Sequence, residues 1–90
     1  MIQDTNSSPR FLLYSRPGCG LCEEMLSELA ALPEAGAFEV DVLDVDADPA
    51  AGVRYGHKIP VLFFGGELVC HGHLDAAEVH KALACHRRPV

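Results

Sequence analysis

Basic residues are scarce in this 90-residue sequence, and its apolar residues form no long run. Seven Lys and Arg face thirteen Asp and Glu, which gives a formal charge of −6. Phosphate binding needs a basic face, and the only basic cluster is His86-Arg87-Arg88, so we expect no nucleic-acid partner. No apolar run approaches the roughly 18 residues of a membrane-spanning helix, so we expect no membrane partner.

The sequence also has no internal repeat, no linker and no pattern of a secretion signal. Residues 1–10 are polar, lack an apolar stretch and contain turn-forming residues, which predicts a flexible leader. We expect one domain over residues 11–86, a tail over 87–90, a monomer and a cytoplasmic location. In that reducing compartment, cysteines are more often catalytic or metal-binding than structural.

Hydrophobic periodicity in the first half predicts two strands and two helices. Residues 11–14 are wholly apolar, which is typical of a buried strand. Apolar residues recur at three- and four-residue intervals, Leu21 among them, and predict a helix from about 19 or 20 to 32. Residues 38–45 alternate like a strand, and Asp48-Pro49 is a typical start for a short helix to about 55.

The second half predicts a hairpin and a last helix. The strands are expected at 60–64 and 67–71, joined by Gly65-Gly66, and a helix should follow from Asp75 to near 85. We therefore predict an α/β fold of order βαβ–α–ββα, a four-stranded mixed sheet with helices on both faces. The first strand should lie parallel to the second, with the third antiparallel on its other side.

A Cys-x-x-Cys motif, Cys19-Gly20-Leu21-Cys22, lies between the first strand and the first helix. A helix N-terminus stabilises a thiolate there, and Arg16 adds positive charge nearby. We predict that Cys19 is the exposed nucleophile, which attacks a disulfide, and that Cys22 then attacks Cys19 and releases the reduced product. This order makes a thiol–disulfide oxidoreductase the leading hypothesis.

Two other hypotheses stay open. Cys19 and Cys22, with the potential ligands in Cys70-His71-Gly72-His73 and Cys85-His86, could hold zinc or an iron–sulfur cluster. The spacing is unlike that of zinc ribbons, and neighbours in a strand face opposite ways, so we assign no metal ligand. We expect Cys70 and Cys85 to be small buried residues. The third hypothesis is a non-catalytic interaction module.

Three segments together resemble the thioredoxin superfamily, in particular its short glutaredoxin-like branch and a group of mostly uncharacterised bacterial proteins. They are residues 14–22 (YSRPGCGLC), 44–56 (DVDADPAAGVRYG) and 59–66 (IPVLFFGG). The resemblance implies a thioredoxin fold of glutaredoxin size, with Cys19 and Cys22 as catalytic residues. The resemblance further implies that the protein requires no cofactor and that glutathione is a candidate reductant. The expected partner is a disulfide-bearing protein or glutathione.

The resemblance also implies a substrate site beside the cysteines. Its residues would be Arg16, Gly20, Leu21, Ile59, Pro60, Gly72 and Asp75. Ile59-Pro60 should be a cis bond facing the cysteines, and Arg16 stands where glutaredoxins often carry a lysine that meets a glutathione carboxylate. The chain departs from glutaredoxins in having Gly-Leu between the cysteines and a single glycine before Asp75. Gly20 follows the first cysteine, and some glutaredoxins with a glycine in that position resemble iron–sulfur carriers.

Overall fold

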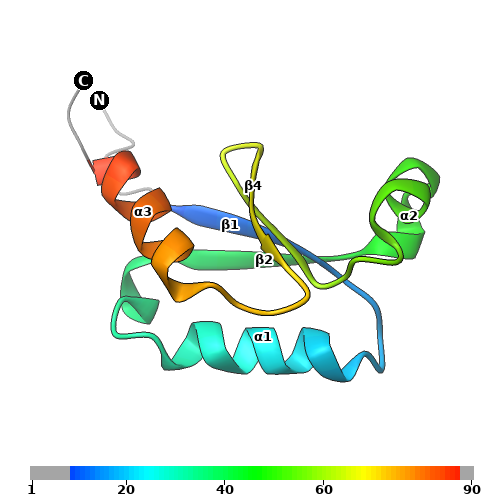
Figure 1. Cartoon of the computed structure of the whole chain (residues 1–90), viewed down its shortest axis with the longest axis horizontal. Helices are drawn as coiled ribbons and strands as arrows, with labels where there is room; N and C mark the ends of the chain where they lie inside the picture. The colour runs from blue at the N-terminus through cyan, green and yellow to red at the C-terminus, as the bar shows by residue number, and fades with distance from the viewer. Residues whose placement is uncertain (1–8, 88–90) are drawn as a thin grey trace.

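The computed structural model describes residues 9–87 and has the predicted order of elements (Figure 1). The elements are β1 (Arg10–Ser15), α1 (Gly20–Ala31), β2 (Glu39–Asp44), α2 (Pro49–Tyr55), β3 (Val61–Phe64), β4 (Glu67–His71) and α3 (Ala76–Arg87), with 3-10 turns η2 (Ala35–Ala37) and η3 (Val45–Ala47). Arg10 belongs to β1 and Arg87 to α3, so the expected leader and tail each overlap the domain by a residue. The remainder of both segments lies outside the described residues, except Pro9, which directly precedes β1.

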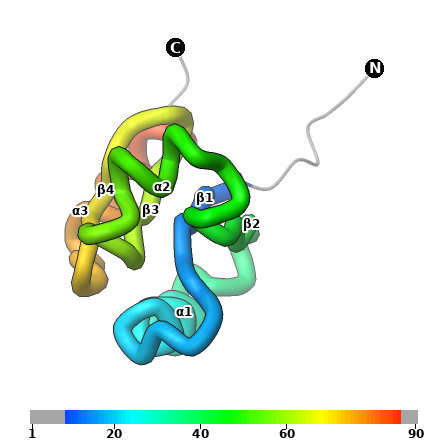
Figure 2. Tube along the Cα trace, turned by 90° about the vertical axis from the view of Figure 1, so that its right-hand side faces the viewer, coloured from blue at the N-terminus to red at the C-terminus, as the bar shows by residue number. Residues whose placement is uncertain are grey.

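The four strands form one mixed sheet in the order β2-β1-β3-β4 (Figure 2). β1 runs parallel to β2 and antiparallel to β3, and β3 pairs with β4 in a hairpin. Gly65 and Gly66 both have positive φ, as the predicted two-residue turn requires. The predicted fold class is confirmed, including the central place of β1.

One face of the sheet carries the hydrophobic core, which α1 and α3 cover. Phe11 and Leu13 of β1 alternate toward this face and are at most 1% exposed. The helices contribute large apolar side chains that pack in the same cluster: Met25 and Leu29 from α1, Val79 and Leu83 from α3. The four-residue spacing of these residues within each helix explains why both helices bury one stripe against the sheet.

The opposite face is covered at one end by α2. Tyr55 of α2 stacks on Tyr14 of β1 with a centroid distance of 5.5 Å and meets Phe63 of β3 at 5.3 Å. Leu43, which pairs with Tyr14, stays 45% exposed, so α2 shields only part of this face. Within residues 9–87, no helix combines the length and apolar character needed to cross a membrane.

Two details of the predicted helical faces were wrong. Leu21 was expected on the buried stripe of α1, yet it is 42% exposed. It lies about 100° around the helix from the buried Cys22 and about 80° from the buried Leu29, and so falls at the rim of the stripe. In α3, the apolar spacing of the sequence likewise predicts Ala84 on the buried face, yet Ala84 is exposed and Ala82 packs on the core.

Candidate functional site

Several of the predicted site residues lie at one edge of the sheet because of the strand register. β1 ends at Ser15, which lies opposite Asp44 at the end of the parallel strand β2. Val61 pairs with both Tyr14 and His71, so Pro60 and Gly72 directly flank the same edge. The loop that carries Cys19 leaves β1 at this edge, so four segments far apart in the sequence meet there.

A tight turn brings the chain from β1 to the first cysteine. Pro17 and Gly18 occupy its centre, and the Cys19 N–H donates a 3.1 Å hydrogen bond to the Arg16 carbonyl oxygen. Gly18 has a φ of +81°, which matches the third position of a type II turn with proline before it. The Pro-Gly pair therefore fixes the direction in which α1 begins.

Cys19 is the N-cap of α1, and its thiol takes the place of the usual cap hydroxyl. Its backbone is extended, with φ −84° and ψ 114°, and its Sγ accepts a 3.3 Å hydrogen bond from the Cys22 N–H. This donor is one of the N–H groups that a helix start leaves unsatisfied. Cys19 is partly exposed, whereas Cys22 is 1% exposed. The two thiols are thus unequal in access, as predicted.

The electrostatic environment makes the thiols unequal in acidity as well. Hydrogen bonding from the Cys22 thiol lowers the pKa of Cys19 below its ordinary value, helped by the N–H groups of Cys22 and Leu21 and by the Arg16 charge. Burial raises the pKa of Cys22, and its neighbour Cys19 raises it further. Cys19 is therefore the more acidic and the more accessible of the two thiols.

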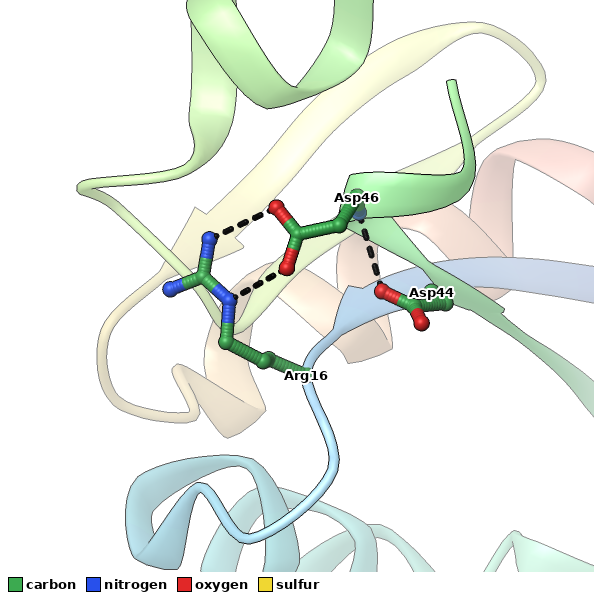
Figure 3. A network of polar contacts seen from close by, with 3 residues as sticks. All are labelled: Arg16, Asp44 and Asp46. Atoms are coloured by element: carbon green, nitrogen blue, oxygen red, sulfur yellow. Dashed lines mark hydrogen bonds and ion pairs between the residues drawn. The ribbon is translucent and has the colours of Figure 1, made fainter. Parts of the chain in front are cut away.

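Arg16 does not stand alone at this site, because Asp46 of η3 holds its guanidinium (Figure 3). The Arg16 Nε lies 2.7 Å from Asp46 Oδ2, and Nη2 lies 2.9 Å from Oδ1. The Asp46 N–H in turn donates a 2.9 Å hydrogen bond to Asp44 Oδ1. The pair raises the pKa of Arg16 and lowers that of Asp46, through hydrogen bonding first and charge second.

The remaining predicted site residues take different places. The Ile59-Pro60 bond is cis, as the resemblance implied, and the Pro60 carbonyl accepts a 2.8 Å hydrogen bond from the Gly72 N–H. Asp75 caps α3, where its Oδ1 accepts a hydrogen bond from the Glu78 N–H at 3.3 Å. Gly20 is the first residue of α1, and an added Cβ there would meet open space. Substrate contact by these residues stays a prediction.

The other two cysteines do not belong to the Cys19–Cys22 pair. Cys70 in β4 is half-buried against the core, and burial raises the pKa of its thiol. Cys85 in α3 is exposed, contrary to the expectation that it would be buried. No three His, Cys, Asp or Glu side chains among residues 9–87 are grouped closely enough to hold a metal ion. The zinc and iron–sulfur hypotheses stay predictions.

Asp46 is the site residue that the sequence reasoning missed. A signal for it exists in the acidic run that directly follows β2, with Asp44 and Asp46 two residues apart. Parallel neighbouring strands end at the same edge of a sheet, so an acid just after β2 lies beside a residue just after β1. Arg16 is that residue, and its long side chain completes the pair.

Comparison with known proteins places the chain in a family. The model of the glutaredoxin-like domain family (DUF836) matches residues 10–84. The uncharacterized proteins Mb0520 of Mycobacterium bovis and Rv0508 of Mycobacterium tuberculosis are each 25% identical over 83 residues, which cover 87% of this chain and 86% of theirs.

Two solved structures are also similar. Protein Ne2328 from Nitrosomonas europaea has a TM-score of 0.73 and 30% identity, covering 88% of this chain and 95% of its own. Protein XcR50 from X. campestris has a TM-score of 0.61 and 30% identity, covering 88% and 99%. With its close Cys19–Cys22 pair on a four-stranded thioredoxin-like fold, the chain belongs to the glutaredoxin-like domain family (DUF836).

Proposed function

We propose that this protein is a dithiol–disulfide oxidoreductase in which Cys19 is the nucleophile and Cys22 the resolving thiol. One observation carries the proposal: the partly exposed Cys19 caps α1 with its Sγ, 3.3 Å from the Cys22 N–H, while Cys22 is buried behind it. A thiolate at a helix start is stabilised by the free N–H groups and the helix dipole. The exposure and the lowered pKa of Cys19 thus both favour its Sγ as the nucleophile.

The reaction then runs in two balanced steps. The Cys19 thiolate attacks one sulfur of a substrate disulfide, the substrate S–S bond breaks, and one substrate thiolate leaves and takes up a proton. Cys22 loses its proton and attacks the Cys19 sulfur, which releases the second substrate thiol. The substrate gains two electrons, and Cys19 and Cys22 are left joined as a disulfide.

The depressed pKa of Cys19 serves the first step, because it keeps the attacking sulfur ionised at a pH where an ordinary thiol is mostly protonated. The raised pKa of Cys22 keeps this thiol protonated until the mixed disulfide has formed. Disulfide-bearing proteins and glutathione mixed disulfides both fit this chemistry.

The test is the reaction of the reduced protein with a neutral disulfide, bis(2-hydroxyethyl) disulfide, followed by mass spectrometry. We expect the wild type to end with an internal disulfide, Cys22→Ser to stop at a stable adduct on Cys19, and Cys19→Ser to lose the fast phase. Cys70→Ser and Cys85→Ser are matched controls, because neither thiol belongs to the Cys19–Cys22 pair, and should form the same internal disulfide as wild type. An adduct on Cys22 in the wild type, or equal rates for Cys19→Ser, would contradict the proposal.

A further inference from the structure

The Arg16–Asp46 pair is the feature of the site that thiol exchange itself does not require. The Arg16 carbonyl holds the turn that carries Cys19, so the guanidinium is tied to the loop of the nucleophile. Its charge acts on Cys19, and the Cys19 charge acts on it. Whatever neutralises this guanidinium therefore changes the field in which a substrate disulfide approaches Cys19.

The surrounding chain is arranged to keep the pair formed. Asp46 is fixed in η3 by its N–H bond to Asp44, so its carboxylate points at Arg16 in Figure 3. Gly52 of α2 and Gly56, the C-cap of α2, lie close to the pair. A Cβ added to Gly56 would lie 3.4 Å from Arg16 Nη2, and one added to Gly52 would lie 3.8 Å from Asp46 Oδ1. A larger residue at Gly56 would also meet the Gly52 carbonyl at 2.5 Å. The C-terminal part of α2 therefore lies against the Arg16–Asp46 pair.

Two carboxylates act on the Arg16 guanidinium. Asp46 uses the Nε and Nη2 edge of the guanidinium, and Nη1 points away from it in Figure 3. Asp44 also lies close enough for its charge to act on Arg16, so one cation faces two carboxylates. An anionic substrate therefore meets an arginine whose charge is already compensated, and a neutral or cationic substrate meets no repulsion.

We propose that Asp46 is a specificity-determining residue: by pairing with Arg16 it makes the site react with neutral and cationic disulfides in preference to anionic ones. The proposal rests on the thiol–disulfide function of Cys19 and Cys22 and adds the charge class of the substrate. It favours disulfides whose flanking groups carry no carboxylate, such as those within neutral or basic peptide segments, over glutathione mixed disulfides. Asp46 acts through Arg16 and does not react itself.

The experiment measures the reaction rates of the reduced protein with three small disulfides at low ionic strength. The probes are cystamine, which is a dication, bis(2-hydroxyethyl) disulfide, which is neutral, and 3,3′-dithiodipropionate, which is a dianion. Each rate is divided by that for the neutral probe in the same variant. Comparing this ratio between variants cancels the intrinsic reactivity of each probe and any common change in Cys19 acidity.

Asp46→Asn removes the negative charge that compensates the guanidinium charge of Arg16. We expect its anionic-to-neutral ratio to rise about threefold to tenfold over wild type and its cationic-to-neutral ratio to fall, with both changes shrinking at high salt. Arg16→Gln should shift the ratios the opposite way. Thermal unfolding shows whether each variant is folded under the conditions of the assay.

The matched control is Asp41→Asn. Asp41 of β2 pairs with Arg10 of β1 in the same two-point manner, at 3.0 and 2.7 Å, but at the other end of β1. Its loss changes the net charge equally and should leave the probe ratios unchanged.

Equal ratios in wild type and Asp46→Asn, or equal shifts in Asp46→Asn and Asp41→Asn, would overturn the role of Asp46 while the oxidoreductase function stands. A wild type that reacts with the neutral probe no faster than Cys19→Ser would overturn both.

Discussion

Two glycines flank Cys19, and the structure predicts opposite effects when each is replaced by alanine. An added Cβ meets no atom within 4 Å at either Gly18 or Gly20, so crowding cannot distinguish the two positions. Gly18 has a φ of +81°, where a side chain costs about 1–2 kcal/mol. Gly20 is the first residue of α1, where alanine stabilises by about 0.4–1 kcal/mol because it restricts the unfolded chain.

These energies convert into a clear difference in thermal unfolding of the reduced protein. For a domain of this size, 1 kcal/mol shifts Tm by about 4–8 °C, so Gly20→Ala should raise Tm by about 2–8 °C and Gly18→Ala should lower it by about 4–16 °C. The assay is circular dichroism melting with excess reductant. A neutral or stabilising Gly18→Ala would refute the left-handed turn that presents Cys19. Gly20→Ala should leave the alkylation of Cys19 unchanged, since the donors to its sulfur are the N–H groups of Leu21 and Cys22.

Three further predictions concern the core, a helix cap and pH. Leu13→Ala, at a side chain with 0% exposure, should cost about 2–5 kcal/mol in urea unfolding, and a loss below 1 kcal/mol would contradict its central place. Asp75→Ala should cost about 0.5–2 kcal/mol in the same assay by removing the α3 cap, and no loss would contradict that role. Because folding lowers the pKa of Cys19, its thiolate adds stability that is fully present above the unfolded pKa, about 8.5, and is lost as pH falls through the folded pKa. Reduced Cys22→Ser should accordingly gain stability over the Cys19→Ser/Cys22→Ser double variant as pH rises, and a gap that shrinks would contradict the sign.

The sequence was sufficient for the fold because its local signals agree with one another. The apolar run around Leu13, the Gly65-Gly66 turn and the Asp48-Pro49 helix start each predicted an element that the structure contains. The Cys19 cap was predictable too, since it depends only on a cysteine placed at a strand-to-helix junction.

The Arg16–Asp46 pair was not predicted, because it depends on the register between two parallel strands and on the reach of a long side chain. Periodicity locates a strand but does not say which residues of two loops meet beyond its end. The exposure of Leu21 and Cys85 was missed for a related reason: spacing defines a helical stripe, whereas the rim of the stripe is set by what packs against it.

The most direct test of the account is the pH dependence of alkylation of each cysteine in the reduced native protein, followed by mass spectrometry. We expect Cys19 to be modified first, with a midpoint below the pKa of an unfolded cysteine, about 8.5, and Cys22 to be protected until the protein unfolds. A Cys19 midpoint at or above that value, or modification of Cys22 before Cys19, would contradict the assignment of Cys19 as the nucleophile.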